Sequence, residues 1–102
     1  MNGIPMRDLA VQFVVELDQL CNKIEGRPVF KNQLIRSGSS IGANIHEAKY
    51  AQSNADFISK FEIALKECYE TEYWLEILLR YLRSRNLSTV PCVTNVVFCV
   101  EN

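Results

Sequence analysis

Apolar residues recur every three or four positions along most of the chain, a spacing that places side chains on one face of an α-helix. In the first such segment the repeating positions are Met6, Leu9, Phe13, Leu17, Leu20 and Ile24. Pro5 suits a first helical turn, and Gly26 followed by Pro28 is a stop signal. The pattern predicts a first helix over about residues 4–25.

A second helical pattern runs through residues 30–48, although its middle is rich in small residues. The stretch SGSSIGAN at residues 37–44 has poor helix propensity, so a loop or a phosphate-binding turn is the alternative. The spacing from Leu34 to Ile41 to Ile45 nevertheless continues across it without a slip. No G-K-[ST] sequence follows the glycines, as a phosphate loop would require. We therefore expect one helix whose small residues admit a neighbouring backbone at close range.

A third and longer helical pattern begins at Ser53 and extends to about residue 85. Ser53 and Asp56 form an S-x-x-D start, in which the serine caps the helix and the aspartate lies near the positive end of its dipole. The first stripe of this helix, spaced by four and three residues, is Phe57, Phe61, Ala64, Cys68, Thr71, Leu75, Leu78 and Leu82. A second apolar stripe on another face holds Ile63, Trp74, Ile77 and Tyr81. One helix with two such stripes can fill a core and also meet a partner subunit.

The last segment is short and rich in β-branched residues. Its helically spaced positions are Val90, Val93, Val97 and Val100. Ser88 can cap a helix there and Pro91 is tolerated in its first turn, although VTNVVFCV would pass for a strand in isolation. Three preceding helices and no partner strand favour a short fourth helix. We expect one all-α domain over residues 1–102, an antiparallel up-down four-helix bundle.

Composition and charge reduce the number of functional classes to which the chain could belong. The 102 residues are 48% hydrophobic and 23% charged, as in a single small globular domain. The formal charge of -1 argues against a protein whose main role is to grip a nucleic-acid backbone. No apolar run approaches the ~18 residues of a membrane span. Because Asp8 interrupts the first apolar stretch and no basic leader precedes it, we also expect no signal peptide. The four cysteines contain no C-x-x-C pair, so we expect free thiols in a reducing cytoplasm.

The second and third predicted helices carry a long motif. The second reads R-S-x-x-S-I-x-x-N-x-x-E, with Arg36, Ser37, Ser40, Ile41, Asn44 and Glu47. The third reads F-x-x-x-F-x-I-A-x-x-E-x-x-E, with Phe57, Phe61, Ile63, Ala64, Glu67 and Glu70. Over residues 33–79 the chain resembles the four-helix-bundle family named after 23S ribosomal RNA intervening-sequence proteins. The resemblance implies an up-down-up-down bundle and a homopentameric ring. A related protein, the accessory variability protein of diversity-generating retroelements, binds RNA and a reverse transcriptase, but this chain lacks its strong basic charge.

Part of this motif is a polar stripe along the second predicted helix. Its members, at spacings of three, four and three residues, are Ser37, Ser40, Asn44 and Glu47. One interpretation is a ligand or RNA site. The interpretation we favour is a structural seam, in which hydroxyls satisfy nearby backbone groups and charges are paired. We therefore expect Arg36 to contact Glu67 or Glu70.

Candidate catalytic and metal-binding residues are few. The glutamates of the third helix invite a carboxylate-bridged metal site, but that site needs two Glu-x-x-His pairs. The one histidine, His46, has Ala43 three residues before it. Cys92 and Cys99 would share a helix face, but two thiols do not complete a zinc site. We therefore expect no enzyme activity, no catalytic residue, and no metal or other cofactor.

The leading hypothesis is a non-enzymatic scaffold or interaction protein that assembles with copies of itself, as a pentameric ring by the resemblance. A lone bundle of this size cannot cover every apolar face of its helices. The residues that we expect at the subunit interface are Trp74, Ile77, Tyr81, Val11 and Val15.

The alternative hypothesis is an accessory protein that binds RNA or a ribonucleoprotein. A local basic excess supports it, with Arg27, Lys31 and Lys49 as the expected RNA contacts. Five aromatic residues could stack on bases: Tyr50, Tyr69, Tyr73, Trp74 and Tyr81. Aromatic residues at helical spacing more often belong to a core or an interface.

Overall fold

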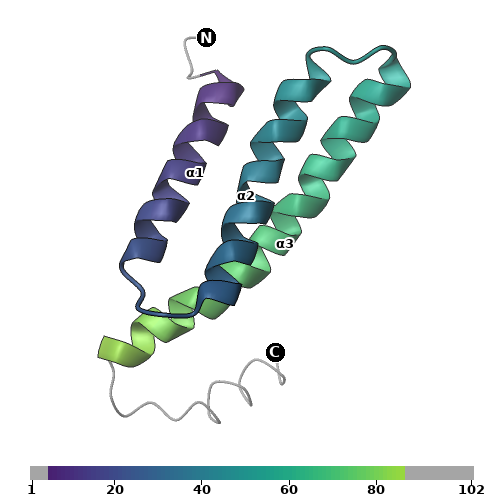
Figure 1. Cartoon of the computed structure of the whole chain (residues 1–102). Coiled ribbons are helices and arrows are strands. Elements are labelled where there is room, and N and C mark those ends of the chain that lie inside the picture. The colour runs from purple at the N-terminus through teal and green to yellow at the C-terminus, as the bar shows by residue number, and fades with distance from the viewer. Residues whose placement is uncertain (1–4, 87–102) are drawn as a thin grey trace.

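The computed structural model describes residues 5–86, which form three α-helices and no strand (Figure 1). Helix α1 spans Met6–Asn22, α2 spans Pro28–Ala48 and α3 spans Asn54–Asn86. Successive helices run in opposite directions, and α2 lies between α1 and α3 and packs against both. The expected all-α class is confirmed for this part of the chain. The fourth helix expected after Ser88 lies outside the described residues.

Helix α1 is shorter than the predicted range of residues 4–25. It begins after Pro5 and ends at Asn22, because a tight turn starts almost at once. Gly26 and Arg27 both adopt positive φ angles, 73° and 60°, which reverse the chain into α2. Ile24 folds under the end of the helix and is buried, so the last apolar position of the predicted stripe reaches the core from the turn.

Helix α2 is continuous through its small residues, as predicted. Gly38 faces Leu17 and Phe13 of α1, and Gly42 faces Ala10. A Cβ atom added to Gly42 would lie 2.9 Å from the Cβ of Ala10. The glycines therefore lie where α1 approaches α2 most closely.

Helix α3 begins with the predicted cap. The backbone N–H of Asp56 donates to Oγ of Ser53 at 3.1 Å, and the Asp56 carboxylate accepts from the backbone N–H of Gln52 at 3.2 Å. The first bond satisfies one of the donors that a helix start leaves without a partner, and the second ties the residue before the cap to the first turn.

The buried core lies toward the end of the layer at which α1 turns into α2. It contains Leu17, Cys21, Ile24, Leu34 and Leu78. Farther from that turn, α1 and α3 leave an open groove over α2, of about 550 Å³. This front groove is lined from all three helices, by Met6, Leu9, Phe13, Ile41, Ile45, Cys68 and Leu75 among others. Within the described residues, none of the helices combines the length and apolarity that a membrane crossing requires.

Candidate functional site

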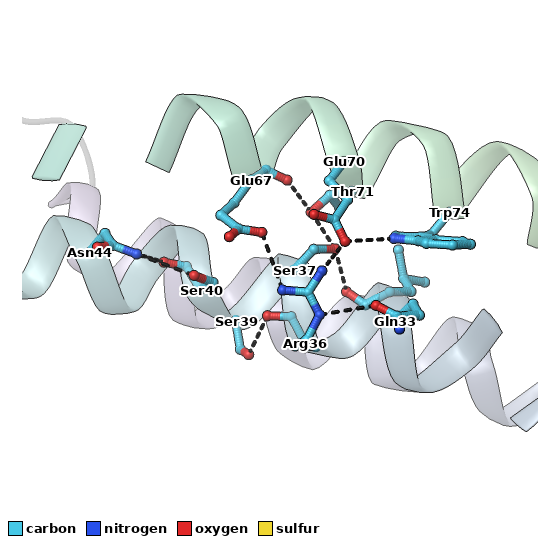
Figure 2. Close-up of polar contacts among 11 residues, drawn as sticks. Gln33, Arg36, Ser37, Ser39, Ser40, Asn44, Glu67, Glu70, Thr71 and Trp74 are labelled. Atoms are coloured by element: carbon cyan, nitrogen blue, oxygen red, sulfur yellow. Dashed lines mark hydrogen bonds and ion pairs between the residues drawn. The ribbon is translucent and has the colours of Figure 1, made fainter. Parts of the chain in front are cut away.

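The centre of the α2–α3 contact is a pair of buried hydroxyls. Ser37 is 0% exposed and Thr71 is 3% exposed, and their hydroxyl oxygens lie 2.9 Å apart (Figure 2). The Thr71 hydroxyl also lies within donating distance of the backbone carbonyl of Glu67, at 2.7 Å. The Ser37 hydroxyl lies within donating distance of the backbone carbonyl of Leu34, at 3.3 Å. These contacts provide partners for polar groups that would otherwise be costly to bury.

Arg36 lies at the edge of the same contact and reaches three side chains. It forms ion pairs with both Glu70 and Glu67, the second with an N···O distance of 3.6 Å. Its Nε donates to Oε1 of Gln33 at 3.0 Å, and the Glu70 carboxylate also accepts from Nε1 of Trp74 at 3.0 Å (Figure 2). The expected contact between Arg36 and the acidic residues of α3 is present, and it involves both of them.

Glu67 is the most deeply placed charge of this cluster. Its Oε1 is buried and has no hydrogen-bond partner among the described residues. The guanidinium of Arg36 at 3.6 Å is its nearest opposite charge in the described ion pairs. Because the Arg36 side chain is half exposed, solvent screens this ion pair, and its contribution to stability is modest.

The rest of the polar stripe is also engaged within the chain. The side-chain amide of Asn44 donates to the backbone carbonyl of Ser40 at 2.8 Å and to its hydroxyl at 3.2 Å. Glu47 pairs with Lys60 of α3 at 3.1 Å. The stripe residues therefore contact α3 or their own helix, an arrangement that holds two helices in register.

The three basic residues expected to contact RNA do not form one patch. The guanidinium carbon of Arg27 lies 4.2 Å from the centre of the Tyr81 ring, in a cation–π contact. Lys31 follows in the first turns of α2, whereas Lys49 lies just past its far end. At 1.5 Å per residue, Lys31 and Lys49 are about 27 Å apart along the helix axis.

The expected interface residues divide into two groups. Trp74, Ile77 and Tyr81 are half-buried, and the rings of Trp74 and Tyr81 each lie with their centres 6.1 Å from that of Phe30. Phe30, at the start of α2 in the same chain, therefore covers part of this apolar stripe, and that part needs no second subunit to cover it. On α1, Val11 is 53% exposed and Val15 is also exposed.

A further exposed apolar row lies along the outer face of α3. It consists of Ile58, Leu65, Tyr69 and Tyr73, each more than half exposed. We assigned the apolar residues of this helix to two other stripes and considered the two tyrosines only as base-stacking candidates. The spacing of seven, four and four residues between these positions is the signal that identifies the row.

The described cysteines are poor nucleophiles. Burial raises the pKa of the Cys21 thiol, and burial followed by the nearby Glu72 carboxylate raises the pKa of the Cys68 thiol. Both groups are therefore protonated at neutral pH. Within residues 5–86, no three histidine, cysteine or acidic side chains come together as metal ligands.

Comparison with known proteins gives one family and one informative structure. The family described as 23S rRNA-intervening sequence protein matches residues 5–88. A crystal structure of a protein of unknown function from the S23 ribosomal protein family of Bacteroides thetaiotaomicron is 51% identical, with a TM-score of 0.65. The match covers 72% of this chain and 71% of that one. No curated protein matches the chain.

Proposed function

The chain belongs to the 23S rRNA-intervening sequence protein family, and from that membership we propose a non-enzymatic interaction protein that assembles with copies of itself into a closed ring, a pentamer by resemblance. One observation carries this proposal: exposed apolar side chains lie on two separate helices of the layer. Val11 and Val15 lie on α1, and Leu65, Tyr69 and Tyr73 lie on α3. Exposed apolar patches of this kind mark protein–protein contacts.

The polar seam supports a structural role for the motif residues. Arg36, Ser37 and Asn44 direct their polar groups to α3 or to their own helix. The proposed setting is the cytoplasm, where reducing conditions keep thiols such as those of Cys21 and Cys68 free.

The proposal includes a short fourth helix, capped by Ser88 and seated in the front groove. The groove is apolar on all three sides, and the valines at helical spacing in this segment supply a matching apolar row. Val97→Asp is expected to lower the free energy of unfolding by about 2 kcal/mol, because it buries a polar group against the groove. Asn95→Asp, off the row, is the matched control. Equal effects of the two substitutions would contradict this helix.

The assembly is tested by the absolute mass of the nuclease-treated full chain, measured by size-exclusion chromatography with light scattering. A mass near five chains supports the ring. A mass of one chain across micromolar concentrations overturns it and means that the exposed rows serve another purpose.

RNA binding is the second candidate, favoured by one basic end of the molecule. Arg27 and Lys31 lie where the α1–α2 turn meets the last turns of α3, and the exposed Arg83 follows Tyr81 there by two residues. Binding to a single-stranded RNA should weaken steeply with salt and on Lys31→Ala, whereas Lys49→Ala at the far end of α2 should have little effect. Binding that is absent, or equally affected by both substitutions, excludes this site.

A further inference from the structure

We infer that neighbouring copies meet through two different surfaces: the outer face of α3 in one copy docks in a cleft between α1 and α2 of the next. This inference rests on the proposed self-assembly, and it identifies the two surfaces that form the contact between subunits. The outer face, here the α3 ridge, consists of Ile58, Leu65, Tyr69 and Tyr73. The cleft, here the back cleft, is lined chiefly by Val11, Val14 and Ala43, with Arg7 and His46 at one end.

The α3 ridge lies on the side of its helix that faces away from α2. Ala64, Thr71 and Leu78 recur every seven residues and are buried. Tyr69 precedes Thr71 by two positions, which turns its side chain by about 200° around the helix. Tyr69 is accordingly 63% exposed.

The back cleft opens on the opposite side of α2 from the front groove. Ile41 lines the groove and Ala43 lines the cleft, two positions apart on one helix. The cleft holds about 280 Å³, and its walls are mostly small apolar side chains. Gly42 and Ala10, which approach each other closely, lie between the walls and present no long side chain to the cleft.

The net charges beside the two surfaces are opposite in sign, although each border also holds one countercharge: Lys66 beside the ridge, and Asp8, which pairs with Arg7 at 3.6 Å, beside the cleft. Glu62 and Glu72 flank the α3 ridge, and neither forms an ion pair with the described part of the chain. Arg7 and His46 line the upper end of the back cleft, and Lys49 lies close to both. Such complementary charge favours one register of docking over others.

The ridge and the cleft also lie at the same height along the helices. The ion pair of Lys60 with Glu47, 3.1 Å long, places the first turns of α3 level with the end of α2. Arg7 and His46 share a small cavity with Phe61, so Glu62 lies level with the basic end of the cleft.

The same alignment continues down the layer. Ala10 and Ile41 line the front groove together with Cys68, which places Tyr69 level with the middle of the back cleft. A rotation about an axis parallel to the helices involves no translation along that axis. Equal heights of the two surfaces are what a closed ring requires, since an offset along the axis at each contact would generate a filament.

The test uses one variant of each surface in the full chain. Tyr69→Glu places a charge on the ridge, and Val11→Glu places a charge in the cleft. Both side chains are more than half exposed, so each variant should fold and keep its helical circular dichroism. Each alone should have the mass of one chain by light scattering. An equimolar mixture should form a species of two chains, because one variant retains an intact cleft and the other an intact ridge. Val29→Glu, on an exposed valine in the first turn of α2, should keep the wild-type mass.

The outcomes separate this inference from the assembly itself. A single-chain mass for the wild-type protein overturns both. An assembled wild type whose mass neither substitution changes overturns only the two surfaces. Dissociated variants that fail to pair when mixed overturn the heterologous arrangement, since a symmetric interface would be lost in both partners. If either first variant fails to fold, Leu65→Glu and Ala43→Glu provide a second pair.

Discussion

The hydroxyl oxygens of Ser37 in α2 and Thr71 in α3 lie 2.9 Å apart in a part of the interior that solvent hardly reaches. Each hydroxyl has one proton, yet three short contacts join this pair to each other and to the carbonyls of Leu34 and Glu67. The two protons can satisfy two of the three contacts at a time, so the side chains depend on one another. The small size of the two residues lets α2 and α3 approach here, and the hydrogen bonding of the two hydroxyls offsets the cost of burying these polar groups.

This dependence predicts non-additive substitutions. Ser37→Ala and Thr71→Val should each lower the free energy of unfolding by about 1 kcal/mol, since each leaves the remaining hydroxyl with fewer partners. The double variant should cost less than the sum of the two. The free energies of unfolding of the wild type, the two single variants and the double variant are measured by urea denaturation at one fixed protein concentration. Strict additivity would mean that the two hydroxyls act independently.

Gly42 tests the close approach of α1 and α2. Alanine there gains about 1 kcal/mol of helix propensity. Its Cβ, however, would lie 2.9 Å from the Cβ of Ala10, an atom that no side-chain rotation can move. Overpacking of this kind costs about 1–3 kcal/mol, so Gly42→Ala should be neutral to destabilising. Ser39→Ala on the exposed side of α2 lacks the clash and should be more stable than Gly42→Ala in thermal unfolding.

Arg36 should contribute modestly to stability, through geometry that lysine lacks. Its side chain is half exposed, so solvent screening limits the loss on Arg36→Ala to about 1 kcal/mol. Arg36→Lys should recover only part of that loss, because one ammonium cannot reach Gln33, Glu67 and Glu70 together. The difference between wild type and Arg36→Ala should shrink in high salt. The matched control is Lys66→Ala, on an exposed lysine that forms none of the described ion pairs.

The described thiols should react slowly in the native protein. Burial raises the pKa of both Cys21 and Cys68. The thiol form is therefore favoured by folding, and this contribution to stability is complete below the unfolded-state pKa. As pH rises through the unfolded-state and then the folded-state pKa, it is lost. Iodoacetamide labelling at pH 7, mapped by peptide mass spectrometry, should be several-fold slower at both sites than in urea, and equal rates would contradict this burial.

Local pattern was sufficient for the helices and for several contacts of the seam. The unbroken α2 followed from apolar spacing despite poor helix propensity, the Ser53 cap from its S-x-x-D start, and the contact of Arg36 with Glu67 or Glu70 from the motif. The end of α1 was wrong by three residues, because the apolar repeat continues to Ile24 while Gly26 and Arg27 already reverse the chain. A hydrophobic repeat reports burial, and a residue in a turn can be as buried as one in a helix.

Side-chain spacing assigns residues to faces of a helix, but it does not say which neighbour covers each face. That depends on where helices cross, and here Phe30 packs on Trp74 and Tyr81 and covers part of the stripe that spacing assigned to a partner. The spacing of Ile58, Leu65, Tyr69 and Tyr73 places them on one face of α3, but only the packing of α2 on the opposite side leaves that face exposed. Arg27 and Lys49 belong to the same basic segment of the chain but lie at opposite ends of α2. Helix formation is a local property of the chain, whereas the surfaces left free to bind result from packing between residues far apart in it.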